Sequence, residues 1–393
     1  MAKVPNIRFK GFTDEWEEGK IGDAFSERDE HSGNGELLSV TINSGIRRAV
    51  DMERTFATGD LSKYKVVQKG DIAYNTMRMW QGACGVSEYS GIVSPAYTIA
   101  TPKDEQDSAF YAYYFKSNKM LQNFRINSQG LTSDTWNLRY PVFASIDIHY
   151  PNKQEQKEIA NFLRTIDSTI SQREKELEKL KNIKRALLER MFPQDWQTTP
   201  SIRFNGFTDE WEEKKADDIF ISFDERNHPE LPVLAATQDK GMVIREEIGY
   251  KIAHNTSNEV VYKHVLPGQF VIHLRSFQGG FAHSNVEGIT SPAYDVFGLR
   301  NPEKHDDCFW KYIFCSSWFI KRLVTVTYGI RDGRNVSYNE FLGLSFMVPS
   351  KQEQIRIAKL FKTLGEQISL RERQLTLLKH TKQALLEQMF VNE

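Results

Sequence analysis

The chain has 393 residues, of which 40% are hydrophobic and 12% aromatic, and this composition favours folded domains over disorder. A chain of this length exceeds the size that a single hydrophobic core usually reaches, so we expect two or more domains. The 51 lysines and arginines against 52 aspartates and glutamates leave a net charge of -1. This balance argues against a protein that coats nucleic acid non-specifically and requires any basic surface to be local.

No apolar run approaches the roughly 18 residues that cross a bilayer, and the N-terminal residues lack the apolar stretch of a signal peptide. We therefore expect a cytoplasmic protein that has no membrane partner. Cys84, Cys308 and Cys315 are too few and too irregularly spaced for a disulfide framework or a zinc site. The sequence thus predicts free buried thiols and no metal site.

The first recognisable element is a motif that occurs twice. IRFKGFTDEWEE fills residues 7–18 and IRFNGFTDEWEE fills residues 202–213, and the two differ only at Lys10 and Asn205. An internal repeat of this kind indicates two copies of one structural unit. We expect each motif to pack an aromatic pair beside an acidic turn, Phe12 with Trp16 and Phe207 with Trp211.

A globular module follows each motif, at about residues 20–149 and 215–347. Short apolar or alternating stretches between Gly, Asn, Asp and Pro predict strands at 64–67, 71–75, 97–100, 259–265, 270–274 and 344–348. Residues 108–123 and 306–323 have a helical pattern. The predicted fold class is therefore α+β, with two globular domains that contain small, mostly antiparallel sheets. The repeated SPAY segments, 94–97 and 291–294, are interpreted as structural entries into buried strands.

Polar segments between these strands carry side chains that can contact base edges or phosphates. Arginine can pair with guanine and Asn or Gln with adenine, whereas lysine mostly positions a phosphate. Arg78 and Arg275 are the leading candidates because both lie beside an aromatic residue and a Gln-Gly turn; a salt bridge that supports the turn is the alternative. The candidate DNA-binding residues are Asn43, Arg47, Arg48, Asn75, Arg78, Trp80, Gln81, Gln129, Thr132, Ser133, Gln238, Lys240, Arg245, His273, Arg275, Gln278, Tyr328, Arg331, Arg334 and Asn335.

A long amphipathic segment ends each half. Residues 153–192 and 351–390 match at 21 of 40 positions, and each segment follows a proline. Apolar residues recur in steps of four and three, interrupted by Arg173, Lys184, Arg371 and Lys382, which is a heptad seam. The pattern predicts helices of about 35 to 40 residues, roughly 50 to 60 Å long at 1.5 Å per residue. We expect the two helices to pair antiparallel within the chain; a coiled coil between two chains would give the same pattern.

Motifs of catalysis are missing from the sequence. It has no phosphate-binding loop, dinucleotide fingerprint, H-E-x-x-H, C-x-x-C or Asn-Pro-Pro-aromatic motif. We therefore expect no catalytic residue, metal or cofactor in this chain. Two other classes remain open. One is a self-contained DNA-modifying or cleaving enzyme that would use the repeated acidic residues 14–18 and 209–213, and the other is a scaffold whose modules bind proteins.

The GFTDEWEE motif, a divergent module, SPAY, and a KQEQ-led heptad helix ending in ALLExMF, all present twice, resemble the specificity subunit of Type I restriction–modification enzymes. The resemblance implies target recognition domains at 1–150 and 194–348, each of which reads one half of a bipartite double-stranded DNA target. It implies spacer helices at 151–193 and 349–393, which form an antiparallel coiled coil and set the gap.

The same resemblance implies partners for a non-catalytic chain. These are two methyltransferase subunits, which bind S-adenosylmethionine, and restriction/translocase subunits, which use ATP and Mg. The assembled complex would be a DNA adenine methyltransferase and endonuclease.

Overall fold

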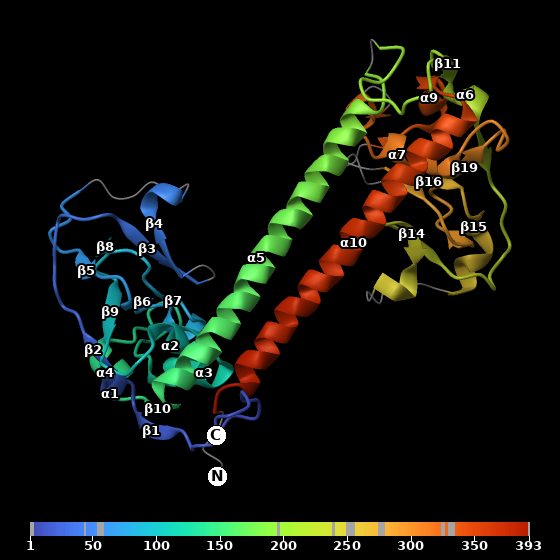
Figure 1. The fold of residues 1–393 in the computed structure, drawn as a ribbon. Helices are drawn as coiled ribbons and strands as arrows, with labels where there is room; N and C mark the ends of the chain where they lie inside the picture. The colour runs from blue at the N-terminus through green and yellow to red at the C-terminus, as the bar shows by residue number, and fades with distance from the viewer. Residues whose placement is uncertain are drawn as a thin grey trace. The chain divides into compact units, whose positions relative to one another are not determined.

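The computed structural model describes residues 4–42, 45–52, 59–194, 197–237, 240–248, 256–273, 280–323, 327–328 and 335–391, as drawn in Figure 1. The chain divides into two compact units, Met1–Glu174 with Arg373–Glu393, and Lys175–Glu372. Two long helices, α5 (Lys153–Arg190) and α10 (Lys351–Gln388), each contribute one end to each unit. Among the described residues, no helix is both long and apolar enough to span a membrane.

The first unit is built around a four-stranded antiparallel sheet. Its strand order is β2 (Phe25–Glu27), β9 (Tyr97–Pro102), β6 (Ile72–Asn75) and β7 (Cys84–Val86). Three antiparallel pairs accompany the sheet: β1 (Glu17–Lys20) with β10 (Asp147–Tyr150), β3 (Leu38–Thr41) with β4 (Gly45–Arg48), and β5 (Lys65–Val67) with β8 (Gly91–Val93). The short helices are α1 (Ile21–Ala24), η1 (Ala49–Asp51), η2 (Met79–Gln81), α2 (Ser108–Tyr114), α3 (Asn118–Asn127) and α4 (Tyr140–Ala144).

The second unit repeats this topology. Its sheet has the order β12 (Phe220–Phe223), β19 (Asp295–Leu299), β16 (Phe270–Ile272) and β17 (Phe281–His283). The accompanying pairs are β11 (Glu212–Lys215) with β22 (Ser345–Val348), β13 (Leu234–Thr237) with β14 (Gly241–Ile244), β15 (Lys263–Val265) with β18 (Gly288–Thr290), and β20 (Thr327–Tyr328) with β21 (Asn335–Val336). Its short helices are α6 (Ala216–Ile219), η3 (Arg245–Ile248), η4 (Thr256–Val261), α7 (Asp307–Phe314), α8 (Ser317–Arg322) and α9 (Tyr338–Leu342).

The predicted α+β class with small antiparallel sheets is confirmed, and three local predictions are wrong. The helical stretch 108–123 is two helices, because α2 ends at Tyr114 and the buried Ser117 caps the start of α3, where its hydroxyl accepts a hydrogen bond from Met120 N. Residues 306–323 are also two helices, α7 and α8. The predicted strand 259–265 is strand only over β15, since η4 continues to Val261.

The repeated KQEQ motif fastens the long helices to their domains. Arg8 holds the fully buried carboxylate of Glu155, with both nitrogen–oxygen distances at 2.7 Å. Arg203 holds Glu353 in the same way, at 2.7 and 2.8 Å. The buried Gln156 accepts a hydrogen bond from Asp107 N and donates one to Pro151 O, and Gln354 repeats both bonds in the second unit. Buried charged and amide groups require such partners, which explains why this motif is nearly identical in both halves.

The repeated Met-Phe ending closes the hydrophobic cores. In the first unit, Phe390 at the end of α10 stacks on Tyr114 of α2 with ring centroids 5.0 Å apart and contacts the buried Trp16. In the second unit, Phe192 at the end of α5 stacks on Phe361 with centroids 6.0 Å apart. Each domain therefore takes into its core the end of the helix that begins at the other domain.

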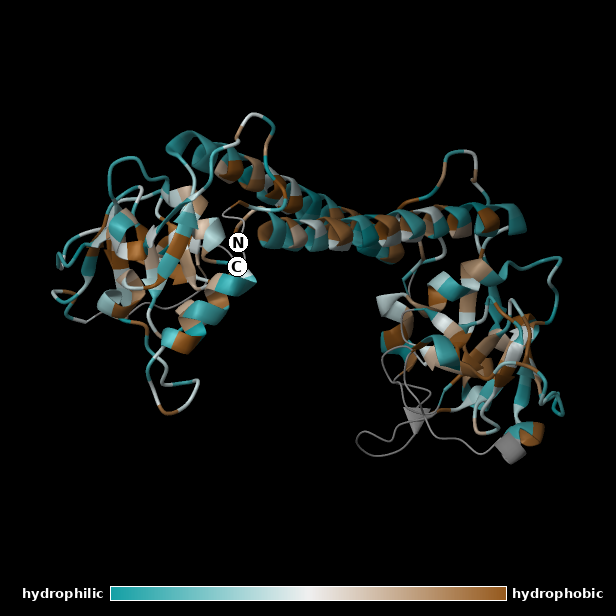
Figure 2. Ribbon diagram, turned by 90° about the horizontal axis from the view of Figure 1, so that it is seen from below, coloured by the Kyte–Doolittle hydropathy of each residue, from teal (hydrophilic) through white to brown (hydrophobic). Residues whose placement is uncertain are grey.

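The two helices pair antiparallel in each unit. In the first unit Glu174 and Asp167 of α5 form ion pairs with Lys379 and Lys382 of α10, so the beginning of one helix lies beside the end of the other. In the second unit Lys181 pairs with Glu372 at 2.7 Å. Apolar bands recur between polar ones along both helices (Figure 2), as the heptad pattern predicts. The intrachain pairing predicted from the seam is confirmed.

Candidate nucleic-acid interface

The turn after β6 presents several predicted residues of the first domain. Asn75 ends the strand, and its side-chain oxygen accepts a hydrogen bond from Met77 N at 3.0 Å. The η2 turn then carries Trp80, whose indole donates to Met77 O at 3.2 Å, and the exposed Gln81. Gly82 closes the turn at φ +78°, a left-handed conformation that favours glycine.

The loop 128–137 lies against this turn. Gln129 and Asn137 exchange two backbone hydrogen bonds at the base of the loop, and Leu138 N donates to Thr76 O at 2.9 Å. Trp136 packs edge-on against Trp80 with centroids 5.3 Å apart, and Arg78 Nη2 lies 3.8 Å from Asp134 Oδ1. The structure therefore brings seven predicted residues together on what we call the η2 surface, residues 75–81 and 125–137. They are Asn75, Arg78, Trp80, Gln81, Gln129 and the exposed pair Thr132 and Ser133 at the loop tip.

The η2 surface contains three residues that sequence reasoning missed. Arg125 of α3 lies over the ring of Trp136, with 5.6 Å between the guanidinium carbon and the ring centroid. Leu131 is fully exposed and Ile126 is 70% exposed, although both are large apolar side chains. Apolar side chains at a loop tip beside arginine and polar groups are typical of a contact surface. Their position could not be inferred without knowing that the loop folds back onto the η2 turn.

Arg47 and Arg48, on the hairpin strand β4, have different surroundings. Arg48 is held by Glu36, at 3.2 Å from Nε to Oε1, and by the ring of Tyr89, at 4.5 Å to its centroid. This arginine therefore supports the hairpin. Arg47 is exposed and lines a cavity of about 930 Å³ whose walls come from the hairpin, β7, α2, α5 and α10, and none of these lining residues belongs to the η2 surface.

This cavity combines charges of both signs within the first unit. Its cations besides Arg47 are Lys116, Arg164, Lys379 and Lys382, and its anions are Glu88, Asp167 and Glu174. Lys116 and Arg164 had not been predicted. The Tyr113 hydroxyl donates to Asp167 at 2.9 Å, and burial, reinforced by that carboxylate, raises the pKa of this tyrosine. Tyr113 therefore stays a hydrogen-bond donor.

In the second domain, the described candidates lie on corresponding turns. His273 N donates to Gly280 O, as Asn75 N donates to Ala83 O, so these two residues occupy equivalent places at the end of the third strand of each sheet. Lys240 is exposed at the β13–β14 turn, and Arg245 is half-buried at the start of η3. For Tyr328 and Asn335, only the β20–β21 backbone pair is described. The predicted residues Asn43, Gln238, Arg275, Gln278, Arg331 and Arg334 lie outside the described residues.

The thiols do not form a reactive site within the described part of the chain. Burial raises the pKa of Cys84 and of Cys308 to about 11, so both are protonated at neutral pH. The prediction of buried thiols holds for Cys84 and is wrong for Cys315, which is exposed, and for Cys308, which is half-buried.

The sequence is similar to a known protein family and to a curated relative. Residues 13–182 match the family described as Type I restriction modification DNA specificity domain. The specificity subunit of the Type I restriction enzyme MjaVIII from Methanocaldococcus jannaschii is 21% identical over 339 residues, which are 80% of this chain and 79% of that protein.

Two solved specificity subunits share the fold along the whole chain. The HsdS subunit from Thermoanaerobacter tengcongensis has a TM-score of 0.51 at 15% identity, with 99% of both chains covered. The Type I restriction–modification S subunit from M. genitalium has a TM-score of 0.58 at 15% identity, with 99% of this chain and 100% of that one covered.

The repeated domains and the paired helices give the chain a two-domain α+β architecture with two long antiparallel helices. Residues 13–182 are thus similar to the Type I restriction modification DNA specificity domain, and the whole chain shares the fold of solved Type I specificity subunits. The matched family and the curated relative are both named for DNA specificity or for the specificity subunit of a Type I restriction enzyme.

Proposed function

We propose that each recognition domain reads one half of a bipartite double-stranded DNA target and that the two long helices set the gap between the halves. One observation carries the proposal. The two domains have the same strand order but different side chains at equivalent turn positions, for example Asn75 and His273, whereas the helices match at 21 of 40 positions. Two domains that share a backbone topology and differ in their surface side chains are fitted to recognise two different half-targets.

In the first domain, the η2 surface is our choice for base contacts. Its arginine, amide and hydroxyl groups supply the donors and acceptors that major-groove readout uses, and Arg47 with its neighbouring cations would contact phosphates. The net charge of -1 leaves little non-specific attraction, so binding depends on such local groups and on partner subunits.

The outer faces of the helices are our choice for docking the partner subunits. Several identical positions are exposed in both helices and do not belong to the seam: Thr165 with Thr363, Ser171 with Ser369, and Ala186 with Ala384. The apolar side chains of Ile183, Leu370 and Leu377 are 42%, 50% and 67% exposed. Solvated surfaces drift readily, so identity at exposed positions favours a shared partner on both copies. We assign this role to two methyltransferase subunits, with restriction/translocase subunits joining the complex; S-adenosylmethionine, ATP and Mg would bind to those partners.

The test is methylation mapping with the assembled complex. The chain is co-produced with its methyltransferase subunits, and the modified sites are read across a genome. The proposal expects one motif of two short specified segments with an unspecified gap, and a salt-dependent footprint on both segments. A continuous motif, or methylation or cleavage by the purified chain alone, would instead favour a self-contained enzyme. The absence of any footprint in the complex would favour a protein-binding scaffold.

A further inference from the structure

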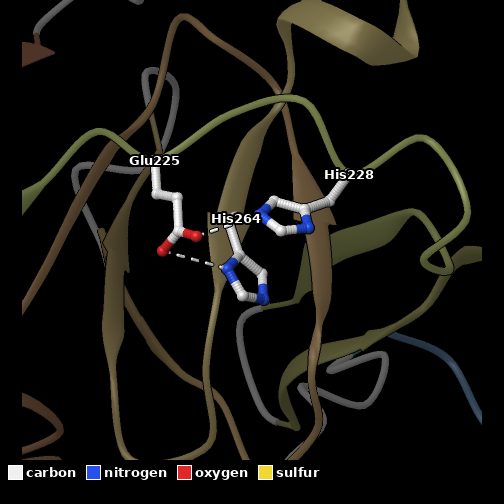
Figure 3. A group of neighbouring side chains, drawn as sticks. All are labelled: Glu225, His228 and His264. Carbon is white, nitrogen blue, oxygen red and sulfur yellow. Dashed lines mark hydrogen bonds and ion pairs between the residues drawn. The ribbon is translucent and has the colours of Figure 1, made fainter.

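Two histidines and three carboxylates converge in the second domain, beside β15. Glu225 and His228 lie in the segment that follows β12, and His264 lies on β15 itself (Figure 3). One possible metal-binding atom from each of the three residues lies within 4.8 Å of the other two. Glu225 Oε1 is 3.0 Å from His228 Nε2, and Glu225 Oε2 is 3.3 Å from His264 Nδ1. The three groups thus present nitrogen and oxygen atoms to a common point.

The outer ring nitrogen of each histidine faces a carboxylate of its own. His264 Nε2 is 2.9 Å from Glu287 Oε1, and His228 Nδ1 is 3.3 Å from Glu230 Oε1. Such an outer carboxylate can hold the proton of one ring nitrogen while the other nitrogen binds a metal ion. Metal-binding histidines in proteins are oriented by the same kind of outer carboxylate.

The inner side of His264 is where a cation would bind. The residue is only 8% exposed, and its buried Nδ1 atom has no hydrogen-bond partner, because its contact with Glu225 lacks hydrogen-bond geometry. A buried polar atom without a hydrogen-bond partner is costly. A cation between the two rings and Glu225 removes this cost.

We propose that Glu225, His228 and His264 bind a divalent transition metal ion, Zn²⁺ in the first instance, with Glu230 and Glu287 as outer carboxylates. Two imidazole nitrogens and a carboxylate oxygen are ligands that Zn²⁺ accepts at about 2.0 to 2.2 Å, with a fourth position filled by another oxygen. The ion would tie the segment after β12 to the β15–β18 pair. The bound ion would thus stabilise the second recognition domain. This proposal departs from the sequence-based expectation of no metal.

The first domain shows what the same position looks like without these ligands. The register of β5 with β8 and of β15 with β18 makes Val66 the counterpart of His264 and Ser90 the counterpart of Glu287. The backbone bond is retained, since Val66 N donates to Glu30 O at 2.8 Å and His264 N donates to Glu225 O at 2.7 Å. A valine therefore fits the strand at this position, which supplies a variant that is compatible with the fold.

The experiment titrates Zn²⁺ into the untagged full-length chain after chelator treatment and measures stoichiometry by calorimetry and metal analysis. The proposal expects one equivalent to bind to the wild type and to raise the unfolding temperature. This binding is expected to be lost in His228→Ala and His264→Val, and to weaken about 10- to 100-fold in Glu287→Gln. Two controls should still bind: His31→Ala, which alters an exposed histidine of the first domain, and His283→Ala, which alters the separate His283–Asp307 pair.

Circular dichroism of the metal-free variants checks that each one folds. The proposal is overturned if the folded wild type takes up no Zn²⁺, or if His264→Val binds it as the wild type does. It is also overturned if His283→Ala, rather than His228→Ala, abolishes binding.

Discussion

Arg8 and Glu155 are joined by two parallel hydrogen bonds of 2.7 Å, and this ion pair connects the N-terminal segment to the first turn of α5. Arg203 and Glu353 form the same ion pair at the first turn of α10. Each carboxylate is almost completely shielded from solvent, so the arginine is its compensating charge.

Arg8→Ala should destabilise the first unit strongly. It leaves the carboxylate of Glu155 buried without a counter-charge, at a cost of about 3 to 5 kcal/mol in the free energy of unfolding. The matched control is Lys20→Ala, which breaks an exposed pair with Asp147 and should cost less than about 1 kcal/mol. Urea unfolding followed by tryptophan fluorescence measures both. Equal effects of the two substitutions would contradict the structural role of the buried pair.

Phe390→Ala should destabilise the first domain, although Phe390 lies near the C-terminal end of the sequence. Removing a ring that stacks on Tyr114 in a core costs about 3 to 5 kcal/mol. Hydrogen exchange should therefore speed up in α2 while α7 of the second domain keeps its protection. Leu377→Ala on the exposed face of α10 is the control and should change stability by less than about 0.5 kcal/mol. Unchanged exchange in α2 after Phe390→Ala would rule out the core role of this ring.

Arg78→Ala should weaken binding of one half-target by about 10- to 100-fold, because a good arginine–base pair is worth about 1 to 3 kcal/mol. Asp134→Ala separates this role from a structural one, since it removes the weak 3.8 Å contact and leaves the arginine free. It should leave DNA binding intact. Binding of the methyltransferase complex to DNA at one fixed salt concentration is the measurement. If both substitutions lower the melting temperature equally and neither affects DNA binding, Arg78 supports the turn instead.

His305 gives the second unit a specific sensitivity to acid. Burial, with help from Lys214, Lys351 and Lys304, lowers its pKa to about 4. The unfolded chain binds this proton near the ordinary histidine pKa of about 6.5, so between pH 6.5 and 4 the unfolded state holds more protons and stability falls as the pH falls. His305→Asn should make that decline shallower below pH 6.5 and change nothing in its slope above it. Thermal unfolding across this range would show parallel curves if the histidine were unimportant.

Much of the fold could be predicted because it follows from periodic patterns. A heptad with steps of four and three defines a helix and its buried face, so α5 and α10 were predictable, and a repeated sequence requires a repeated topology. A short apolar run located β6, and alternation of apolar residues located β22. The division at Ser117 was harder, because both α2 and α3 have helical composition and a single hydroxyl separates them.

The candidate sites were less predictable because they depend on contacts across loops. Arg78 and Asp134 are brought together only because Leu138 binds the backbone of Thr76, and no local pattern encodes that bond. His228 and His264 meet because the segment after β12 is bonded to β15, where His264 N donates to Glu225 O, rather than through a spacing known for metal ligands. Composition identifies polar loops, but the pairs within them form only when the fold is complete.

Shortening both long helices by one heptad should shorten the gap in the DNA target. Deleting residues 171–177 and 373–379 together removes both members of the Lys379–Glu174 pair and keeps the Lys382–Asp167 and Lys181–Glu372 pairs. Seven residues at 1.5 Å each are about 10.5 Å, or about three base pairs at 3.4 Å, so methylation mapping should find a gap shorter by about three. Inserting one heptad in each helix should lengthen it by the same amount.

A deletion of four residues from α5 alone provides the contrast, because it shifts one apolar seam against the other and should abolish methylation rather than change the gap. An unchanged gap in the double heptad deletion would show that the helices do not set the spacing. Since the Met-Phe endings and the Arg–Glu pairs lie outside the deleted segments, both domains keep the contacts that fold them, and a change in spacing can be attributed to helix length.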